Sequence, residues 1–189
     1  CHSNTLLLNI GASPVIFHAL KAILDFNAVT ITLITGYQAD LIAKALGDLK
    51  SHSNLSIVNN PDWGTGRASS LKLALNNQPG DTSGVLVHLA DMPIVPTALI
   101  NRLISIFLEH RRLTFPVFNN KKGNPIIWPR DDWPKLMEIH GDKTAFELIK
   151  SRWDEATKLE LGPDEEPSQW DLDTPENYQL MLKYWDKRS

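Results

Sequence analysis

Two groups of aspartates occupy positions where a carboxylate could hold a divalent cation. Asp91 follows the apolar stretch 84–90 and precedes Met92 and Pro93. In α/β enzymes, the carboxyl end of a central strand is where ligands bind. Because Mg²⁺ prefers carboxylate oxygens and keeps waters and substrate phosphates in its other positions, one or two such aspartates suffice for a nucleotide site. The alternative for Asp91 is a turn or helix-cap residue.

A second acidic pair, Asp171 and Asp173, lies near the end of the chain. In an extended segment these side chains point to the same side, because side-chain direction repeats every two residues. The alternative is a helix start, since Asp173 or Thr174 stands directly before Pro175 and Glu176. The two interpretations are both open at this point.

A glycine-containing segment before Leu71 could bind phosphate. Gly64 and Gly66 would let backbone approach a ligand closely. Arg67 can pair with a phosphate or carboxylate, and Ser69 and Ser70 offer hydroxyls at a helix start. Ordinary turn chemistry is the alternative. The segment is neither a Walker A loop nor a complete dinucleotide fingerprint.

The remaining polar positions carry weaker signals. Asn124-Pro125 and Gly141-Asp142 stand in two polar turns that would be ordinary in loops. The histidines lack metal-ligand spacing, and His88, inside an apolar strand, is expected to be a hydrogen-bonded core residue. No Ser-His-Asp order or nucleophile elbow is present.

Alternating strands and helices must position these residues. Strands are predicted over 29–35, 55–58, 84–91, 114–118 and 125–128, from β-branched or continuous apolar runs. Helices are predicted over 14–24 with Ser13 as the cap, then over 39–46, 69–75, 97–108, 145–151 and 175–185. The acidic stretch 162–167 is predicted to be a solvated loop. The alternation predicts an α/β sandwich with a mainly parallel sheet.

Composition narrows the function classes. The 189 residues suit one domain, and a net charge of -3 gives no basic surface for a nucleic-acid backbone. The single cysteine, Cys1, suits a reducing compartment. No apolar run reaches the ~18 residues of a membrane span. We therefore expect a cytoplasmic protein with neither nucleic acid nor membrane as a partner.

Seven motifs stand in order from about Leu6 to about Tyr178. They are Leu-Leu-Leu-x-x-Gly at Leu6 to Gly11, Asn60-Pro61-x-Trp63, Gly66-x-x-Ser69-Ser70-Leu71, His88-Leu89-Ala90-Asp91-Met92-Pro93, Gly123-Asn124-Pro125, Gly141-Asp142 and Asp171-Leu172-Asp173-Thr174-Pro175-Glu176. Together they resemble the nucleotidyltransferases of molybdenum-cofactor biosynthesis, most closely their cytidylyltransferase branch. The resemblance implies one domain over residues 1–189, a three-layer α/β sandwich of the Rossmann-like, nucleotide-diphospho-sugar transferase type.

The resemblance also implies roles for particular residues. Asp91 and Asp173 would jointly hold Mg²⁺ and act in catalysis. The resemblance places Gly66, Ser69 and Ser70 against the nucleotide, and the acceptor pocket at Asn124, Pro125, Gly141 and Asp142. Gly64 and Arg67 are expected at the nucleotide from the chemistry of their own segment, and Arg67 departs from the family, which commonly has Met there. An in-line attack on an α-phosphorus needs positioning and charge neutralisation more than covalent help, which suits such a site.

The implied reaction transfers a nucleoside monophosphate from a nucleoside triphosphate to a molybdopterin-type phosphorylated acceptor and releases pyrophosphate. The Gly-x-x-Ser-Ser-Leu turn favours CTP over GTP. The implied protein partners are transient ones among the molybdoenzyme maturation proteins.

The sequence departs from the family at its beginning. Members open with a strand and a Gly-rich phosphate loop, followed by a lysine where Thr5 stands here. We therefore expect residues upstream of Cys1, because the missing strand lies in the middle of the family's sheet. Two alternatives are a non-catalytic molybdopterin- or nucleotide-binding module without the triphosphate loop, and a transferase of the same fold that uses a sugar phosphate or another phosphorylated alcohol.

Overall fold

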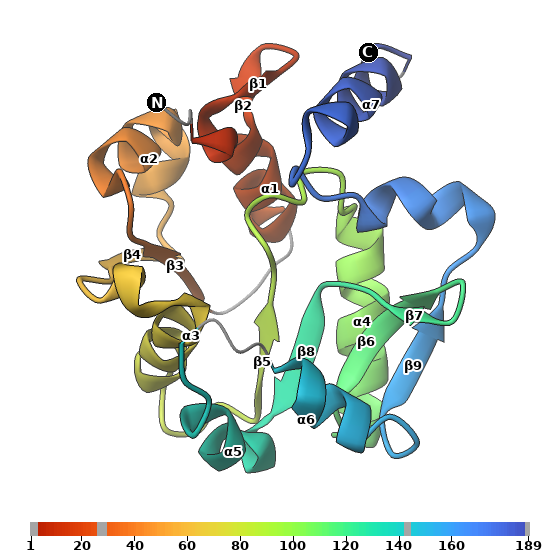
Figure 1. Ribbon diagram of the computed structural model, residues 1–189. Helices are drawn as coiled ribbons and strands as arrows, with labels where there is room; N and C mark the ends of the chain where they lie inside the picture. The colour runs from red at the N-terminus through yellow and green to blue at the C-terminus, as the bar shows by residue number, and fades with distance from the viewer. Residues whose placement is uncertain (1–3, 26–29, 142–144, 188–189) are drawn as a thin grey trace.

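The computed structural model describes residues 4–25, 30–141 and 145–187, which form an α/β fold (Figure 1). Strand β3 (Ile31–Thr35) pairs in parallel with β4 (Leu55–Asn59). A second sheet has the order β5 (Gly84–Val87), β8 (Ile126–Pro129), β6 (Thr114–Phe118) and β7 (Lys121–Lys122), with β9 (Thr157–Glu160) parallel to β6. Because β8 is antiparallel to both β5 and β6, the strands β5, β6 and β9 run in one direction. Strand directions are therefore mainly parallel, as predicted.

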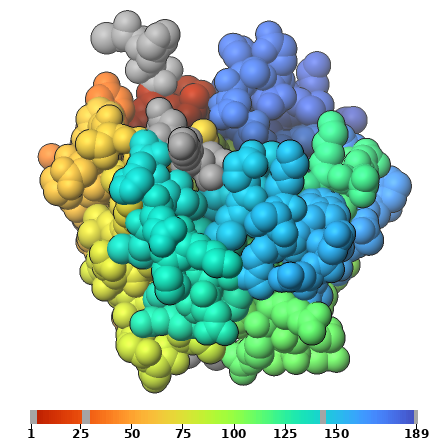
Figure 2. All heavy atoms as spheres, turned by 60° about the horizontal axis from the view of Figure 1, so that its bottom comes forward, coloured from red at the N-terminus to blue at the C-terminus, as the bar shows by residue number. Residues whose placement is uncertain are grey.

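Helices cover both faces of the second sheet, which confirms the three layers. In β8, Ile126 and Trp128 pack into one core cluster and Ile127 into another, because successive side chains of a strand point to opposite faces. The first cluster is covered by α3 (Arg67–Asn76), α5 (Trp133–Met137) and α6 (Phe146–Ser151), and the second by α1 (Val15–Leu24) and α4 (Thr97–His110). Figure 2 shows α5 in teal and α6 in light blue side by side over the first face.

The smaller sheet has its own core. Ile16 and Leu20 of α1 pack with Ile42 of α2 (Ala39–Ala45) and with the half-buried Leu33 of β3. At the C-terminus, α7 (Pro175–Asp186) contributes Met181 to a further cluster that includes residues of the short strands β1 (Asn9–Ile10) and β2 (Ser13–Pro14) and of the segment before α7. Helix α1 thus faces both sheets and joins their cores.

Strands β3 and β5 are each paired on one edge only within the described ranges. The side chains of β5 are half-buried, whereas those of β8 are fully buried. The strand is therefore shorter than the predicted 84–91, and it is less buried than the predicted cover on both faces implies. Strand β5 ends at Val87 because residues 88–90 find no ladder partner past Ile126.

Two smaller predictions were also wrong. Pro14, not Ser13, is the N-cap of α1, and no side chain caps that helix because Ser13 pairs with Ile10. The acidic stretch after Leu161 is not a loop but a 3-10 helix, η5 (Pro163–Gln169), held by polar contacts to α4 and to the β7–β8 turn. Within the described part of the chain, no helix is long and apolar enough to cross a membrane.

Candidate functional site

Asp91 lies in the turn that leaves β5 and has an oxygen with no partner. Its Oδ1 is buried and makes no hydrogen bond within the described structure. Burial raises the pKa of the Asp91 carboxyl, the carboxylates of Asp173 and Asp171 raise it further, and Arg67 opposes them. Charged groups from two distant parts of the chain therefore act on Asp91 after the end of β5.

The segment before α7 places its two aspartates on the Asp91 side. Leu172 between them is buried in the core cluster of Ile10, Val15 and Met181, while Asp173 is exposed. The hydroxyl of Thr174 accepts a hydrogen bond from the Asn177 backbone N–H at 3.2 Å, so Thr174 is the N-cap of α7. The helix-start interpretation is therefore confirmed at Thr174, and the cation-binding role of Asp171 and Asp173 stays a prediction.

These carboxylates fit a divalent cation that completes its coordination with other ligands. Within the described ranges, no cluster of three or more His, Cys, Asp or Glu side chains is close enough to hold a metal ion. Asp91 nevertheless has an unpaired buried oxygen and a like-charged neighbour in Asp173, which a cation would compensate. Such a site would rely on waters and substrate phosphates, as Mg²⁺ sites in nucleotide enzymes do.

The turn into α3 is held by buried polar contacts. The amide of Asn60, only 2% exposed, donates to Ser69 Oγ and to Ser70 Oγ, both at 2.9 Å. Gly66, with φ 112° before the first turn of α3, adopts a conformation that favours glycine. Ser69 and Ser70 thus hold the shape of the predicted nucleotide turn, which leaves the exposed Arg67 as its cation.

Gly64 lies one turn earlier, in the 3-10 segment η3 (Trp63–Thr65). A Cβ added there would meet no atom within 4 Å. No described contact joins Gly64 to Asp91, so its predicted role in nucleotide binding stays a prediction.

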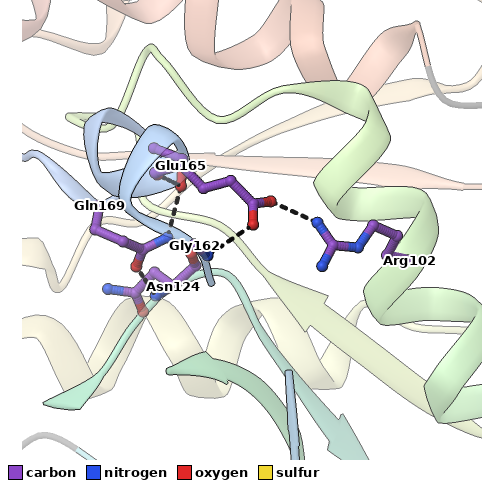
Figure 3. Close-up of polar contacts among 6 residues, drawn as sticks. Arg102, Asn124, Gly162, Glu165 and Gln169 are labelled. Atoms are coloured by element: carbon purple, nitrogen blue, oxygen red, sulfur yellow. Dashed lines mark hydrogen bonds and ion pairs between the residues drawn. The ribbon is translucent and has the colours of Figure 1, made fainter. Parts of the chain in front are cut away.

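The predicted acceptor turn lies at the same end of β5 as Asp91. Val87 pairs with Ile126, so Pro125 and Asn124 continue past the end of the ladder, alongside the chain that leads to Asp91. The backbone of Asn124 is held by the side chain of Gln169, which Figure 3 shows reaching across from η5. Register and hydrogen bonds together therefore bring Asn124 and Pro125 to the Asp91 end of the sheet.

A lysine not singled out by sequence reasoning stands beside Asn124. Lys122 Nζ donates to Asn124 Oδ1 at 3.3 Å, and burial lowers the pKa of the Lys122 amine. Lys122 stands in a turn with two adjacent lysines, a pattern that does not predict burial of either side chain. The structure thus adds a partly desolvated cation to the acceptor turn.

Gly141 meets the nucleotide turn directly. Its carbonyl accepts a hydrogen bond from the backbone N–H of Ala68 at 3.2 Å, in the first turn of α3. Asp142 lies outside the described residues. The Gly141 turn and the Gly66 turn lie far apart in the sequence and are therefore neighbours only in the folded structure.

The expectation for His88 was wrong. Both ring nitrogens are buried without a hydrogen-bond partner in the described structure, and burial lowers the pKa of His88 to about 4. The position of His88 in an apolar run predicted its burial correctly, but no local pattern shows which groups pack against the ring.

Two hollows open at the carboxyl ends of β3 and β4, beside the residues above. One, of about 400 Å³, is bordered by Thr35, Gly36 and Ala90, the residue before Asp91. The other, of about 590 Å³, is bordered by Gly36, Asn60 and Trp63. Ligands of open α/β sheets bind at this end of the strands. Asp91, Asp173 and Arg67 do not themselves line either hollow.

Comparisons with known proteins agree with this architecture. Residues 2–157 match the family model of the MobA-like NTP transferase domain. The bifunctional protein GlmU of Kineococcus radiotolerans is 35% identical over 96 residues, which cover 50% of this chain. They cover only 19% of GlmU, so the match spans about a fifth of that relative.

Solved structures share the fold at low identity. Rv0371c of Mycobacterium tuberculosis H37Rv, in complex with manganese, superposes with a TM-score of 0.78 at 21% identity, covering 97% of this chain and 94% of that one. A 4-diphosphocytidyl-2C-methyl-D-erythritol synthase from Anaerococcus prevotii superposes with a TM-score of 0.75 at 13% identity, covering 94% and 88%. Because the family model covers most of the chain, this protein belongs to the nucleotidyltransferase family of MobA-like NTP transferase domains.

Proposed function

We propose that this protein is a Mg²⁺-dependent nucleotidyltransferase that transfers CMP from CTP to a molybdopterin-type phosphorylated acceptor. The observation that carries the proposal is that Asp173 and Arg67, from two distant segments, both act on the carboxyl of Asp91, whose Oδ1 is buried without a partner in the described structure. Such a cluster supports phosphoryl-group chemistry, which depends on positioning and charge neutralisation. The Gly-x-x-Ser-Ser-Leu turn supports CTP.

The chain's own residues would divide the work between the two substrates. Asp91 and Asp173 would hold the cation, which supplies charge neutralisation at the phosphates when bound. Arg67, exposed at the start of α3, would pair with a phosphate of the nucleotide. Lys122 would pair with the acceptor phosphate, and Asn124 and Pro125, with the turn at Gly141 and Asp142, would form the acceptor side.

In the proposed reaction, an oxygen of the acceptor phosphate forms a bond to the α-phosphorus of CTP. The bond from that phosphorus to the bridging oxygen of the β-phosphate breaks, and the electron pair leaves with pyrophosphate. No protein atom forms a covalent intermediate. The residues act by orienting the attacking oxygen in line with the leaving group.

A sugar-phosphate or other phosphorylated alcohol is a second candidate acceptor. The similarity to GlmU over 96 residues and the structural likeness to a 4-diphosphocytidyl-2C-methyl-D-erythritol synthase support an acceptor other than molybdopterin. The two candidate reactions use the same nucleotide chemistry and differ only in the acceptor that the predicted acceptor turns would bind. The acceptor must therefore be identified by assay.

The test is a pyrophosphate-release screen with CTP or GTP, Mg²⁺ or Mn²⁺, and three acceptors: molybdopterin, glucose 1-phosphate and erythritol 4-phosphate. Turnover with CTP and molybdopterin is the expected result. Turnover only with another acceptor would overturn the molybdopterin assignment. Absence of turnover with all three, together with no CTP binding by calorimetry, would overturn the enzyme proposal in favour of a binding module.

A further inference from the structure

The side chain of Gln169 makes a two-point contact with the backbone of a single residue. Its Oε1 accepts from the Asn124 N–H at 2.9 Å, and its Nε2 donates to the Asn124 carbonyl at 3.0 Å. Figure 3 shows this pair beside the contacts of Glu165, which belongs to the same 3-10 helix. A side-chain amide that hydrogen-bonds both the N–H and the carbonyl of one residue fixes the position and the orientation of that residue.

Gly123 leaves the room that this contact needs. A Cβ added at Gly123 would lie 2.1 Å from Gln169 Oε1 and 2.8 Å from its Cδ. The glycine of the Gly-Asn-Pro motif is therefore required by the approach of Gln169. This contact also explains, in physical terms, why a turn beside two lysines carries glycine at this position.

Gln169 stands two residues before Asp171, at the start of the segment that carries both aspartates. The following residues are anchored independently, by burial of Leu172 and by the Thr174 cap of α7. The aspartate segment is thus fixed without Gln169, whereas the described backbone contact of Asn124 to this segment runs through Gln169 alone.

We propose that Gln169 is a positioning residue that sets the Asn124 turn, and with it the acceptor, at a fixed distance from Asp171 and Asp173. This inference rests on the proposed function, since it assigns the turn to acceptor binding. Gln169 touches neither substrate. Its effect is to align the acceptor oxygen with the nucleotide, so its loss affects acceptor use and spares nucleotide binding.

The experiment compares Gln169→Met with Gly123→Ala, which breaks the same contact from the other side. Both variants are assayed for pyrophosphate release with CTP and the acceptor that gives the highest wild-type turnover in the screen above. Each should raise the acceptor KM about tenfold, the size expected when one to two net hydrogen bonds are lost. The KM for CTP should stay within about twofold, because the anchors of the aspartate segment are intact. The double variant should lose no more than either single variant, since both remove one contact.

Arg102→Met is the matched control. Arg102 pairs with Glu165 and so anchors the same 3-10 helix from α4, without touching Asn124. Both KM values of this variant should stay within about twofold of wild type, because an exposed ion pair contributes little.

Three results would overturn the inference while leaving the proposed function intact. They are an acceptor KM unchanged in Gln169→Met, an equal rise in the CTP KM, or an equal effect of Arg102→Met, which would indicate general loosening of η5. A wild-type protein without turnover would overturn the proposed function first and the inference with it.

Discussion

The five-stranded sheet and the two-stranded sheet of β3 and β4 differ in how completely their strands are covered. In the sheet of β5, β8, β6 and β9, the inner strands β6 and β8 consist almost wholly of fully buried residues. In the pair β3 and β4, most residues are half-buried, and β5 resembles this pair more than its own neighbours. The difference follows from pairing, because β3 and β5 each have one edge without a ladder in the described structure.

The candidate site lies between these two regions. Arg67 begins α3, which contacts β3 and also packs against the well-covered sheet, whereas Asn124 and Lys122 come from the β7–β8 end of that sheet. Asp91 belongs to the connection that leaves β5, whose open edge faces away from β8. The well-covered sheet thus supplies a rigid frame, and the less covered side leaves the hollows in which a nucleotide could bind. Rigid elements that carry a site beside less stable ones are common, because ligand binding needs access.

The largest expected effect is at the junction of the two regions. Asp91→Asn should reduce CTP-dependent pyrophosphate release roughly 10³-fold, because the neutral amide cannot hold the cation that neutralises the phosphates. Circular dichroism should be unchanged. The control Asp81→Asn alters an exposed turn before β5 and should keep activity within about twofold. Full activity in Asp91→Asn would remove this residue from the mechanism.

The difference in burial between the two sheets can be measured by replacing one leucine in each region with alanine. Leu113, directly before β6, is fully buried, whereas Leu33 of β3 is half-buried. Leu113→Ala should lower the free energy of unfolding by about 3–4 kcal/mol, and Leu33→Ala by about 1–2 kcal/mol, since less apolar contact is lost. Urea titrations of the two variants decide the question. Equal losses would show that β3 is as tightly packed as β6.

His88, which directly follows β5, should make the stability of the folded protein depend on pH. Burial lowers the pKa of His88 from 6.5 to about 4, so the unfolded chain takes up this proton at a higher pH than the folded protein. The contribution of His88 to stability is therefore complete above pH 6.5 and is lost as the pH falls toward 4. The loss should reach at most about 3 kcal/mol. Urea midpoints at pH 7 and pH 4.5 should fall further for wild type than for His88→Leu, and parallel falls would contradict the assignment.

The smallest expected effect tests whether polar contacts hold the less covered region together. Asn60→Ala removes the amide that binds Ser69 and Ser70 and should lower the free energy of unfolding by about 2 kcal/mol, because two hydrogen bonds to these half-buried serines are lost. Asn77→Ala, at the exposed end of the same helix, should cost less than about 0.5 kcal/mol. Thermal melts of both variants provide the comparison, and equal shifts would argue against a special role for Asn60.

Local patterns in the sequence predicted most of the elements. β-branched runs located β3 and β4, and apolar spacing located α1, α4 and α7 within a few residues. Helix α5, strand β9 and η5 were missed, because short or polar segments take their conformation from the elements they contact. Strand β9 in particular has a polar sequence, Thr-Lys-Leu-Glu, and owes its pairing to β6.

The residues with site chemistry were recognisable from the chain alone, because Asp91, Asp173 and the Gly66 turn stand where strands end and helices begin. Only the tertiary structure decided which of them meet. The proximity of Asp91 to Asp173, the hydrogen bond from Ala68 to Gly141, and the hold of Gln169 on Asn124 each join segments far apart in sequence. Such contacts depend on strand order and register, which are set by the packing of the whole core and not by any local pattern.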